Sequence, residues 1–466
     1  MRRFDWRWLA VSSGFVIRLM VAGLTLAVLA AQAETRPQYG GTLYVTMLVA
    51  PASLDPADNT QPDSFARRGL TQLMFEPLVT MDSNGRPHAA LATSWQAASG
   101  NQRWQFRLRR GIKFHDDMPL TAEVAAASLR AANLTWNVFA DADSIVIELN
   151  SADTGLLAEL ALPRNAIAKR NSDNKPIGTG PFHIVDWAPG KKLTLAAEES
   201  YWGGRPFLDS IEIGMGTSYR DQMMALELGK ADLVEVAPEQ VHRVSLEANR
   251  LASSAPLELL ALLFAREVTS PDDKLLREAL AMSVERSSIR SVLLQGAGLP
   301  AAGILPNWMS GYGFVFPTDA DLPQARHVRE QVRGIPKWTL RYDNGDPIAR
   351  LLAERIALNG KDAGLSLQTT SAASADLQLV RVPLPADPWI ALADVAARAG
   401  LPEAKSQGGS VEDLYAREHA ELAEQRIIPL FHLPASYASA PTLKNWTLRP
   451  DGSWSLADAW LGSGKP

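Results

Sequence analysis

The sequence predicts a mixed α/β fold of about three domains, and three observations support this prediction. Helical and strand patterns alternate along most of the chain, from Arg67–Phe75 to Val411–Gln425, which is typical of mixed α/β proteins. A chain of 466 residues corresponds to about three domains at ~150 residues each. The segment Pro176–Ile213 contains a glycine- and proline-rich turn, then a hairpin and a further strand.

The N-terminus has the features of a secretory signal peptide, predicted to occupy residues 1–33. Four arginines supply positive charge, Leu19–Ala31 is apolar, and Ala31-Gln32-Ala33 is typical of a cleavage site. The alternative is an uncleaved membrane anchor. Because the apolar run is shorter than the ~20 residues that a spanning helix needs, we expect cleavage after Ala33.

Cysteine content and charge limit the location and partners. The chain has no cysteine, so it cannot carry a thioether-linked lipid or a disulfide. Together with the predicted signal peptide, this indicates an untethered periplasmic protein. The formal net charge is −5, and the predicted signal contributes four arginines and one aspartate, so residues 34–466 carry −8. A mildly acidic chain suits solubility and argues against nucleic acid or anionic lipid as a partner.

Hydrophobic periodicity and turn-forming residues predict the elements of the first half of the chain. Thr121 is a predicted N-cap, because a threonine before an apolar helical run can accept a hydrogen bond from the first turn. Alternation and β-branched content predict the strands. The expected elements are strand 42–46, helix 67–75, turn 82–85, strand 104–108, helix 121–129, strand 144–149, and a hairpin of 182–185 with 193–195.

In the second half, apolar residues recur at helical spacing in four segments. In the helix predicted over Asp273–Ile289, for example, Leu276, Leu280 and Val284 share one face. The expected elements are helix 219–229, strand 257–264, helix 273–289, helix 348–359, strand 376–380, helix 411–425 and strand 427–432.

The segment Pro176–Ile213, PIGTGPFHIVDWAPGKKLTLAAEESYWGGRPFLDSIEI, closely resembles the signature of the family 5 extracellular solute-binding proteins, the peptide- and nickel-binding receptors of ABC importers. Further blocks resemble that family in the same order: Phe75-Glu76-Pro77-Leu78, Leu91-Ala92-Thr93-Ser94-Trp95, Lys113-Phe114-His115-Asp116, Pro119-Leu120-Thr121-Ala122-Glu123 and Gly229-Lys230-Ala231-Asp232. The resemblance spans nearly the whole chain after the signal and weakens after about residue 300.

This resemblance implies a periplasmic-binding-protein type II (Venus-flytrap) fold with an extra inserted lobe, giving three mixed α/β lobes. Lobe I would be discontinuous, with residues 38–59, 176–256 and 427–466; lobe II, the insertion, would be 60–175, and lobe III 257–426. The two crossings between lobes I and III would form a hinge at Leu263, Phe264, Ala265, Ile428 and Pro429.

The implied function is a periplasmic substrate-binding protein that captures a peptide or a similar small polar solute between lobes I and III. It would deliver the solute to the membrane permease and its ATPases. We expect a monomer that needs no cofactor or metal. Two alternatives stay open: a sensor of the same fold without transport, or a binder of a nickel chelate, haem or oligosaccharide. An enzyme is disfavoured, because the sequence contains no G-x-S-x-G, H-E-x-x-H or P-loop motif.

Ligand type depends on the segment around Asp387-Pro388. Peptide-binding members of the family anchor the peptide ammonium on an aspartate, three residues before such a pair, but here that position holds Leu384. Asp387 is the remaining candidate. Pro383 and Pro385 lack N–H groups on the same edge of any extended strand, so a peptide added as a strand would lose two donors if that edge faces the cleft. Pro51 removes another donor in the matching segment of lobe I.

The predicted ligand-binding residues are Val49, Ala50, Arg381, Asp387 and Trp389. Arg381 could bind a carboxylate in bidentate fashion, although a solvated surface arginine is the commoner case.

Other candidates have simpler interpretations. Asp55 before Pro56 is expected to form a turn, and Trp95, Trp104 and Trp202 to pack within lobes. His432 is expected to be buried and hydrogen-bonded. His115-Asp116-Asp117 lacks the spacing of a metal motif.

Overall fold

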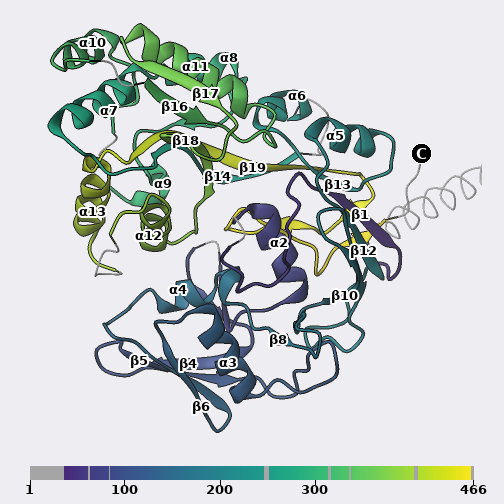
Figure 1. Cartoon of the computed structure of the whole chain (residues 1–466). Helices are drawn as coiled ribbons and strands as arrows, with labels where there is room; N and C mark the ends of the chain where they lie inside the picture. Colours follow the sequence, from purple (N-terminus) through teal and green to yellow (C-terminus); the bar gives the residue numbers. More distant parts are fainter. Residues whose placement is uncertain are drawn as a thin grey trace, which may run out of the picture.

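In the computed structural model the described residues are 36–60, 63–82, 84–245, 251–312, 316–334, 337–402 and 408–462. The predicted signal peptide lies outside them. The chain forms a mixed α/β structure (Figure 1), as the alternating patterns predicted. None of the helices in these ranges has the length and apolar content to span a bilayer.

One eleven-stranded sheet runs through the molecule, in the order β10-β11-β12-β1-β13-β19-β14-β18-β16-β17, with β15 on β19. The strands are β1 (Thr42–Thr46), β10 (Phe182–Ala188), β11 (Lys192–Ala197), β12 (Ser210–Gly214), β13 (Leu233–Glu235), β14 (Leu251–Phe264), β15 (Leu299–Pro300), β16 (Lys337–Arg341), β17 (Ser366–Thr370), β18 (Leu377–Pro383) and β19 (Ile427–Ser439). Segments far apart in sequence therefore share one hydrogen-bonded sheet.

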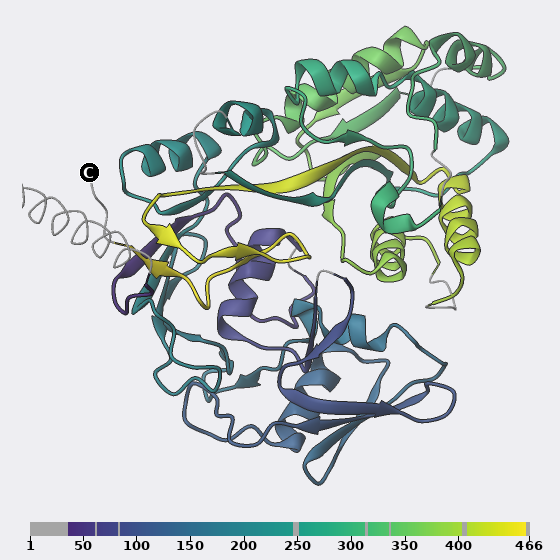
Figure 2. The same cartoon turned by 180° about the vertical axis from the view of Figure 1, so that it is seen from behind.

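Two long antiparallel strands, β14 and β19, join the two ends of this sheet (Figure 2). Because side chains alternate between the faces of a strand, β14 serves two hydrophobic cores. Leu257, Leu259 and Ala261 belong to a core shared with β1 and β11, whereas Leu260 and Leu262 belong to a core under the lobe III helices. The register between the two strands shifts between Ser253 and Glu258 and again after Leu260.

Helices cover this sheet. Those in the range predicted as lobe III are α7 (Pro271–Ser283), α8 (Arg286–Val292), α9 (Asn307–Ser310), α10 (Leu322–Glu330), α11 (Ala349–Asp362), α12 (Pro388–Arg398) and α13 (Val411–Ala423); α5 (Tyr219–Glu227), α6 (Val241–Ser245) and the 3-10 turn η3 (Pro238–Gln240) belong to the range predicted as lobe I. The helix predicted over 273–289 is two helices, because Val284 is extended (ψ 112°) and ends α7.

The insertion predicted as lobe II holds a separate antiparallel sheet, β4-β5-β7-β6. Its core contains Phe106, Ile145 and Leu129. Thr121 caps the helix as predicted, accepting from Val124 N at 3.4 Å. The elements are α2 (Phe65–Met74), β2 (Val79–Met81), β3 (Pro87–Ala89), β4 (Ala92–Ala97), β5 (Arg103–Leu108), α3 (Ala122–Ala132), β6 (Asn137–Asp141), β7 (Ser144–Glu148), α4 (Leu156–Leu160), η2 (Pro163–Asn165) and β8 (Lys169–Arg170). Strand β8 pairs with β9 (Pro176–Ile177), the first residues of the next range predicted as lobe I.

The C-terminal strands fold back beside α2 (Figure 2). They are β20 (Leu443–Lys444), β21 (Thr447–Leu448), β22 (Trp454–Ser455) and β23 (Trp460–Leu461). A Cβ on Gly69 of α2 would lie 2.7 Å from the Trp454 ring, so glycine allows this close packing. The contact brings the loop between β21 and β22 to the same region as α2, where the candidate site lies.

Candidate ligand cleft

Three cavities lie in a row between the elements predicted as lobe III and the rest of the chain. Their volumes are about 1100, 760 and 570 Å³, and we call them cavities 1, 2 and 3. Cavities 1 and 3 share Leu162 and Pro163, and cavities 2 and 3 share Asp63 and Arg398. The shared lining residues show that the three cavities adjoin one another in the order 1, 3, 2 along the cleft.

Cavity 1 is walled by all three predicted lobes. Lobe I contributes Ser253–Ala255 and Leu448–Asp451, lobe II contributes Phe75–Pro77 and Ala161–Pro163, and lobe III contributes Pro385–Pro388. Most of this lining is apolar or small, with a few polar groups, as is usual for small-molecule sites. A solute held here would contact both sides of the cleft.

Glu76 anchors one wall of cavity 1. This carboxylate is 8% exposed and accepts hydrogen bonds from Thr179 Oγ1 (2.8 Å), Tyr201 OH (2.8 Å) and Trp202 Nε1 (2.9 Å). Burial raises the pKa of Glu76, although the three donors oppose the shift. The Arg109 guanidinium lies 4.5 Å from the Trp202 ring centroid. Because these hydrogen bonds satisfy its carboxylate, Glu76 holds the side chains of Tyr201 and Trp202 in place on this wall of cavity 1.

Asp387 reaches cavity 1 from the start of α12. Its Oδ1 accepts from Trp389 N (2.9 Å) and Ile390 N (3.1 Å), so the side chain is the helix N-cap. Burial raises the pKa of Asp387, and the two N–H groups oppose the shift. The predicted ligand residue therefore has a structural role and also lines the cleft.

Cavity 2 contains Arg381, already paired within the protein. Its Nε and Nη2 donate to Glu258 Oε2 at 2.8 and 2.6 Å, and its Nη1 to Asp346 Oδ2 at 3.2 Å. Burial opposes the charge, but Glu258 outweighs it and holds the pKa of Arg381 well above its ordinary value. Two carboxylates of the chain itself, those of Glu258 and Asp346, are thus the partners of Arg381, which is neither free for a ligand nor merely solvated. Val49 also lines this cavity.

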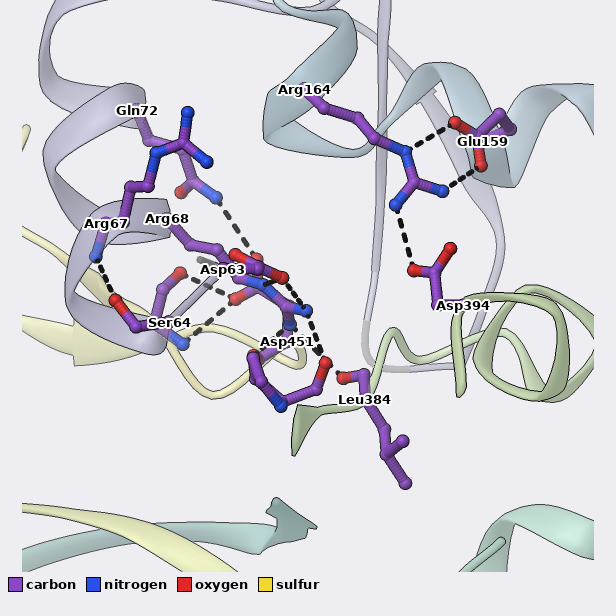
Figure 3. A network of polar contacts seen from close by, with 12 residues as sticks. Asp63, Ser64, Arg67, Arg68, Gln72, Glu159, Arg164, Leu384, Asp394 and Asp451 are labelled. Atoms are coloured by element: carbon purple, nitrogen blue, oxygen red, sulfur yellow. Dashed lines mark hydrogen bonds and ion pairs between the residues drawn. The ribbon is translucent and has the colours of Figure 1, made fainter. Parts of the chain in front are cut away.

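Cavity 3 is bordered by two arginines that bridge the cleft (Figure 3). Arg68, 2% exposed on α2, pairs with Asp63 at 2.6 Å and donates to Pro383 O (2.9 Å) and Leu384 O (3.2 Å) of lobe III. It also donates to Asp451 O at 3.1 Å. Arg68 therefore ties α2 to both lobe III and the C-terminal loop.

The second bridge is Arg164 of η2. Its guanidinium pairs with Glu159 at 2.6 Å within lobe II and with Asp394 of α12 at 2.8 Å across the cleft (Figure 3). Burial raises the pKa of Asp394, an effect that Arg164 opposes. The two bridges show that the structure is a closed arrangement of the cleft walls.

Pro383 lies on the cleft side of β18. Leu384 N donates to Leu257 O of β14 at 2.7 Å, and alternate residues of a strand point their N–H groups to opposite edges. The missing donor of Pro383 therefore faces away from β14, and Arg68 occupies the Pro383 carbonyl on that edge. Pro385 lies beyond the end of β18. At Pro383 this edge of β18 is poorly equipped to accept a peptide as an added strand.

The remaining predicted ligand residues lie outside the three cavities. Ala50 is exposed in the loop after β1. Trp389 packs beside the core shared by lobe I, with Arg417 5.8 Å from its ring centroid. Pro51 is buried.

The predicted hinge residues lie at the lobe III ends of the two long strands. Leu263 and Phe264 are buried at the end of β14, and Ile428 and Pro429 pair with Leu262 and Ala261. The ladder is also irregular between Ser253 and Glu258, where the strands pass from one half of the sheet to the other, so this stretch is a second candidate hinge.

Residues with simpler interpretations behave as expected. Asp55 Oδ1 accepts from Ala57 N at 3.0 Å, which closes a turn, and its other oxygen pairs with Arg170. His432 is 5% exposed and bonds Ile304 O at 2.9 Å; burial lowers its pKa to about 4. Trp95, Trp104 and Trp202 pack in or beside the lobe II core, and Trp202 also lines cavity 1.

The described ranges hold no group of three or more His, Cys, Asp or Glu side chains suited to a metal ion. The triplet His115-Asp116-Asp117 is used locally: His115 Nε2 bonds Gly180 O at 2.9 Å, Asp116 pairs with Lys169, and Asp117 pairs with Lys113.

The sequence did not predict the bridging arginines Arg68 and Arg164, nor Arg449 in the C-terminal loop that lines cavity 1. Arg68 carried a signal, because it is a charged residue on the buried face of an amphipathic helix, where an unpaired charge would be costly. Arg164 and Arg449 carried none, since their surroundings come from segments far away along the chain.

The chain is similar to known proteins in both sequence and structure. The family model of the bacterial extracellular solute-binding proteins, family 5 Middle, matches residues 86–382. The nickel-binding protein NikA of Staphylococcus aureus is 29% identical over 241 residues, which cover 48% of this chain and 49% of that protein. The matched segment thus spans about half the length of that relative.

Solved structures match over a larger share. NikA of S. aureus in complex with Ni(L-His)2 superimposes with a TM-score of 0.77 at 20% identity, covering 90% of this chain and 99% of that one. The oligopeptide-binding protein AppA of Bacillus subtilis, in complex with a nonapeptide, gives a TM-score of 0.79 at 19% identity, covering 92% and 100%. These likenesses show the periplasmic-binding-protein type II fold.

Proposed function

The chain belongs to the bacterial extracellular solute-binding proteins of family 5, and on that basis we propose that it is the periplasmic receptor of an ABC importer. It captures a small polar solute in the cleft between lobes I and III and presents it to the permease. The receptor binds its solute without changing it covalently.

The row of three adjoining cavities is the observation that carries this proposal. Cavities 1, 2 and 3 lie between the elements predicted as lobe III and the other predicted lobes, and among the described strands only the paired β14 and β19 cross between the halves of the large sheet. A solute that contacts both walls binds the closed form better than the open form, so it shifts the population towards closure. The permease can then distinguish loaded from empty receptor.

The walls favour a compact solute over an extended peptide. NikA is described with a nickel–histidine complex and AppA with a nonapeptide, so the fold accommodates both kinds of ligand. In this chain the cleft edge of β18 lacks the donor of Pro383, and Arg68 occupies the carbonyl of the same residue. Strand addition depends on those main-chain hydrogen bonds, so we infer a small solute held mainly by side chains.

A ligand screen with a shape measurement tests this function. The mature chain is screened by thermal shift against di- to nonapeptides, nickel–histidine chelate, haem and oligosaccharides, and each hit is followed by small-angle X-ray scattering. A true solute stabilises the folded state by about 2.7 kcal/mol at a hundredfold excess over Kd and keeps or reduces the radius of gyration. Asp387→Asn is the matched variant, since an amide preserves the N-cap and removes the charge. Conversion of a bound solute to product, or hits that leave an open shape, would contradict the proposal.

A further inference from the structure

Arg449 lines cavity 1 without a salt-bridge partner among the described residues, although Asp451, Asp458 and Glu76 act on its charge from a greater distance. It follows β21 in the loop that lobe I contributes to the cavity, and it is half-buried. Its Nη2 makes one long hydrogen bond, 3.5 Å to Ser455 Oγ, and its Nε is buried without an acceptor. No carboxylate oxygen of the described residues lies within 4.0 Å of its guanidinium.

The other arginines of the cleft walls described above are paired. Arg68 has Asp63, Arg164 has Glu159 and Asp394, and Arg381 has Glu258 and Asp346. Arg449 is the sole cation among the described residues that line cavity 1. Burial lowers the pKa of Arg449, because a half-buried guanidinium is poorly solvated, and the carboxylates of Asp451, Asp458 and Glu76 oppose this shift without reaching hydrogen-bond distance. An anion entering the cavity would supply the missing partner.

Gln72 of α2 adds a second polar group with an unsatisfied atom to the lining of the same cavity. Its Nε2 donates to Asp451 Oδ2 at 3.2 Å, which orients the amide, and its Oε1 is buried without a donor. Asp451 is itself held by Ser453, whose N and Oγ donate to Oδ1 at 3.0 and 2.6 Å. Cavity 1 therefore offers a cationic donor and an amide acceptor on the wall formed by α2 and the C-terminal loop.

We propose that Arg449 and Gln72 form an anion subsite in cavity 1, which holds the carboxylate of a small organic acid that carries a hydrogen-bond donor beside that carboxylate. This inference rests on the proposed receptor function and names the class of solute. The guanidinium supplies the fork of donors that matches a carboxylate, and the Gln72 oxygen accepts from the neighbouring donor.

The remaining lining limits the rest of the solute. Leu162, Met309 and Ile390 give the cavity an apolar interior, which suits an apolar body. Four acidic residues also line it, namely Glu76, Asp82, Asp387 and Asp451, and like charges repel, so a second negative group on the solute would be disfavoured. The predicted solute is thus a monoanion with a compact apolar body, and a phosphate dianion fits less well.

Four matched probes test the subsite by calorimetry on the mature chain: N-acetyl-L-leucine (anion), N-acetyl-L-leucinamide (neutral), L-leucinamide (cation) and N-acetyl-L-glutamate (dianion). We expect the anion to bind most tightly. Arg449→Met should weaken its binding by about 10- to 100-fold, because a charge-assisted hydrogen bond is lost. Arg107→Met is the control, since Arg107 is exposed on β5, outside the three cavities.

Arg449→Lys keeps the charge without the fork and should give an intermediate Kd, so it reports on the subsite even if Arg449→Met folds poorly. The inference is overturned if the neutral or cationic probe binds as tightly as the anion, if none of the four binds, or if Arg449→Lys binds the anion unchanged. In each of these cases a different solute that closes the cleft would leave the receptor function standing. Failure of every solute to bind would remove the receptor function as well.

Discussion

The carboxyl group of Glu418 shows how the burial of a single side chain changes its charge. This α13 side chain is 0% exposed; its Oε1 accepts from Leu305 N at 2.8 Å and from Ile304 N, and its Oε2 is buried without a donor. Burial raises the pKa of Glu418 to about 7, against the two N–H groups. The carboxyl group therefore keeps its proton in the folded state over a range where it would ionise in the unfolded chain.

We predict that Glu418→Gln stabilises the protein at pH 8 and has little effect at pH 5. The folded pKa lies above the unfolded value, so the parent is fully stabilised below about pH 4.5 and loses stability as the pH rises to about 7. Glutamine keeps the acceptor and cannot ionise, so the variant should gain about 3 kcal/mol at pH 8. Urea unfolding at both pH values measures this.

Two controls accompany that measurement. Glu412→Gln, at an exposed position of the same helix, should show no such pH-dependent gain. His432, whose pKa is lowered to about 4 by burial, contributes the opposite slope between about pH 4 and 6.5, so only the difference between variant and parent is diagnostic. A constant difference from pH 5 to 8 would disprove the assignment.

At the scale of elements, local chemistry made most strands and helices predictable. The hairpin of β10 and β11 and the capped helix α3 lie where the sequence predicted them. Helix α12 was missed although its signals were present: Asp387 is the N-cap and Pro388 the first residue, both favoured there. The same Asp-Pro pair was interpreted as a ligand anchor instead. Strand β14 is longer than predicted because its first residues, with little apolar alternation, are ordered by pairing with β19.

The turn before β10 gives a prediction at this scale. A Cβ on Gly178 would lie 1.9 Å from Met74 O and 2.6 Å from the Phe75 ring. The turn can therefore pack this closely against the end of α2 only because residue 178 has no side chain. Gly178→Ala should lower the free energy of unfolding by about 3 kcal/mol or more, as overpacking against fixed backbone does. Gly214→Ala is the control, because its nearest neighbour would be 3.5 Å away. Equal urea midpoints for the two variants would refute the packing argument.

At the scale of the whole molecule, the closed cleft depends on contacts that no local pattern reveals. Arg68 meets Leu384 across 316 positions of sequence, and Arg164 meets Asp394 across 230. Hydrophobic period and turn chemistry act within a few residues, so they predict elements but not which side chains from distant elements face one another. The cleft residues that the sequence did indicate, Asp387, Arg381 and Val49, came from a family resemblance, and the structure gives Asp387 and Arg381 partners within the chain.

The Arg164–Asp394 bridge makes closure testable. Because it joins η2 of lobe II to α12 of lobe III, it exists only when the walls are together, and it favours the closed population by its differential energy. Arg164→Gln should therefore increase the radius of gyration of the solute-free protein and raise the solute Kd by about 2- to 10-fold, since a partly exposed pair contributes little. Asp394→Asn should do the same, and the double variant should add nothing further, because both substitutions remove the same interaction.

Arg110→Gln is the control: it breaks an exposed pair with Asp143 inside lobe II and should leave shape and affinity unchanged. If Arg164→Gln expands the protein no more than Arg110→Gln does, the bridge follows closure and does not stabilise it.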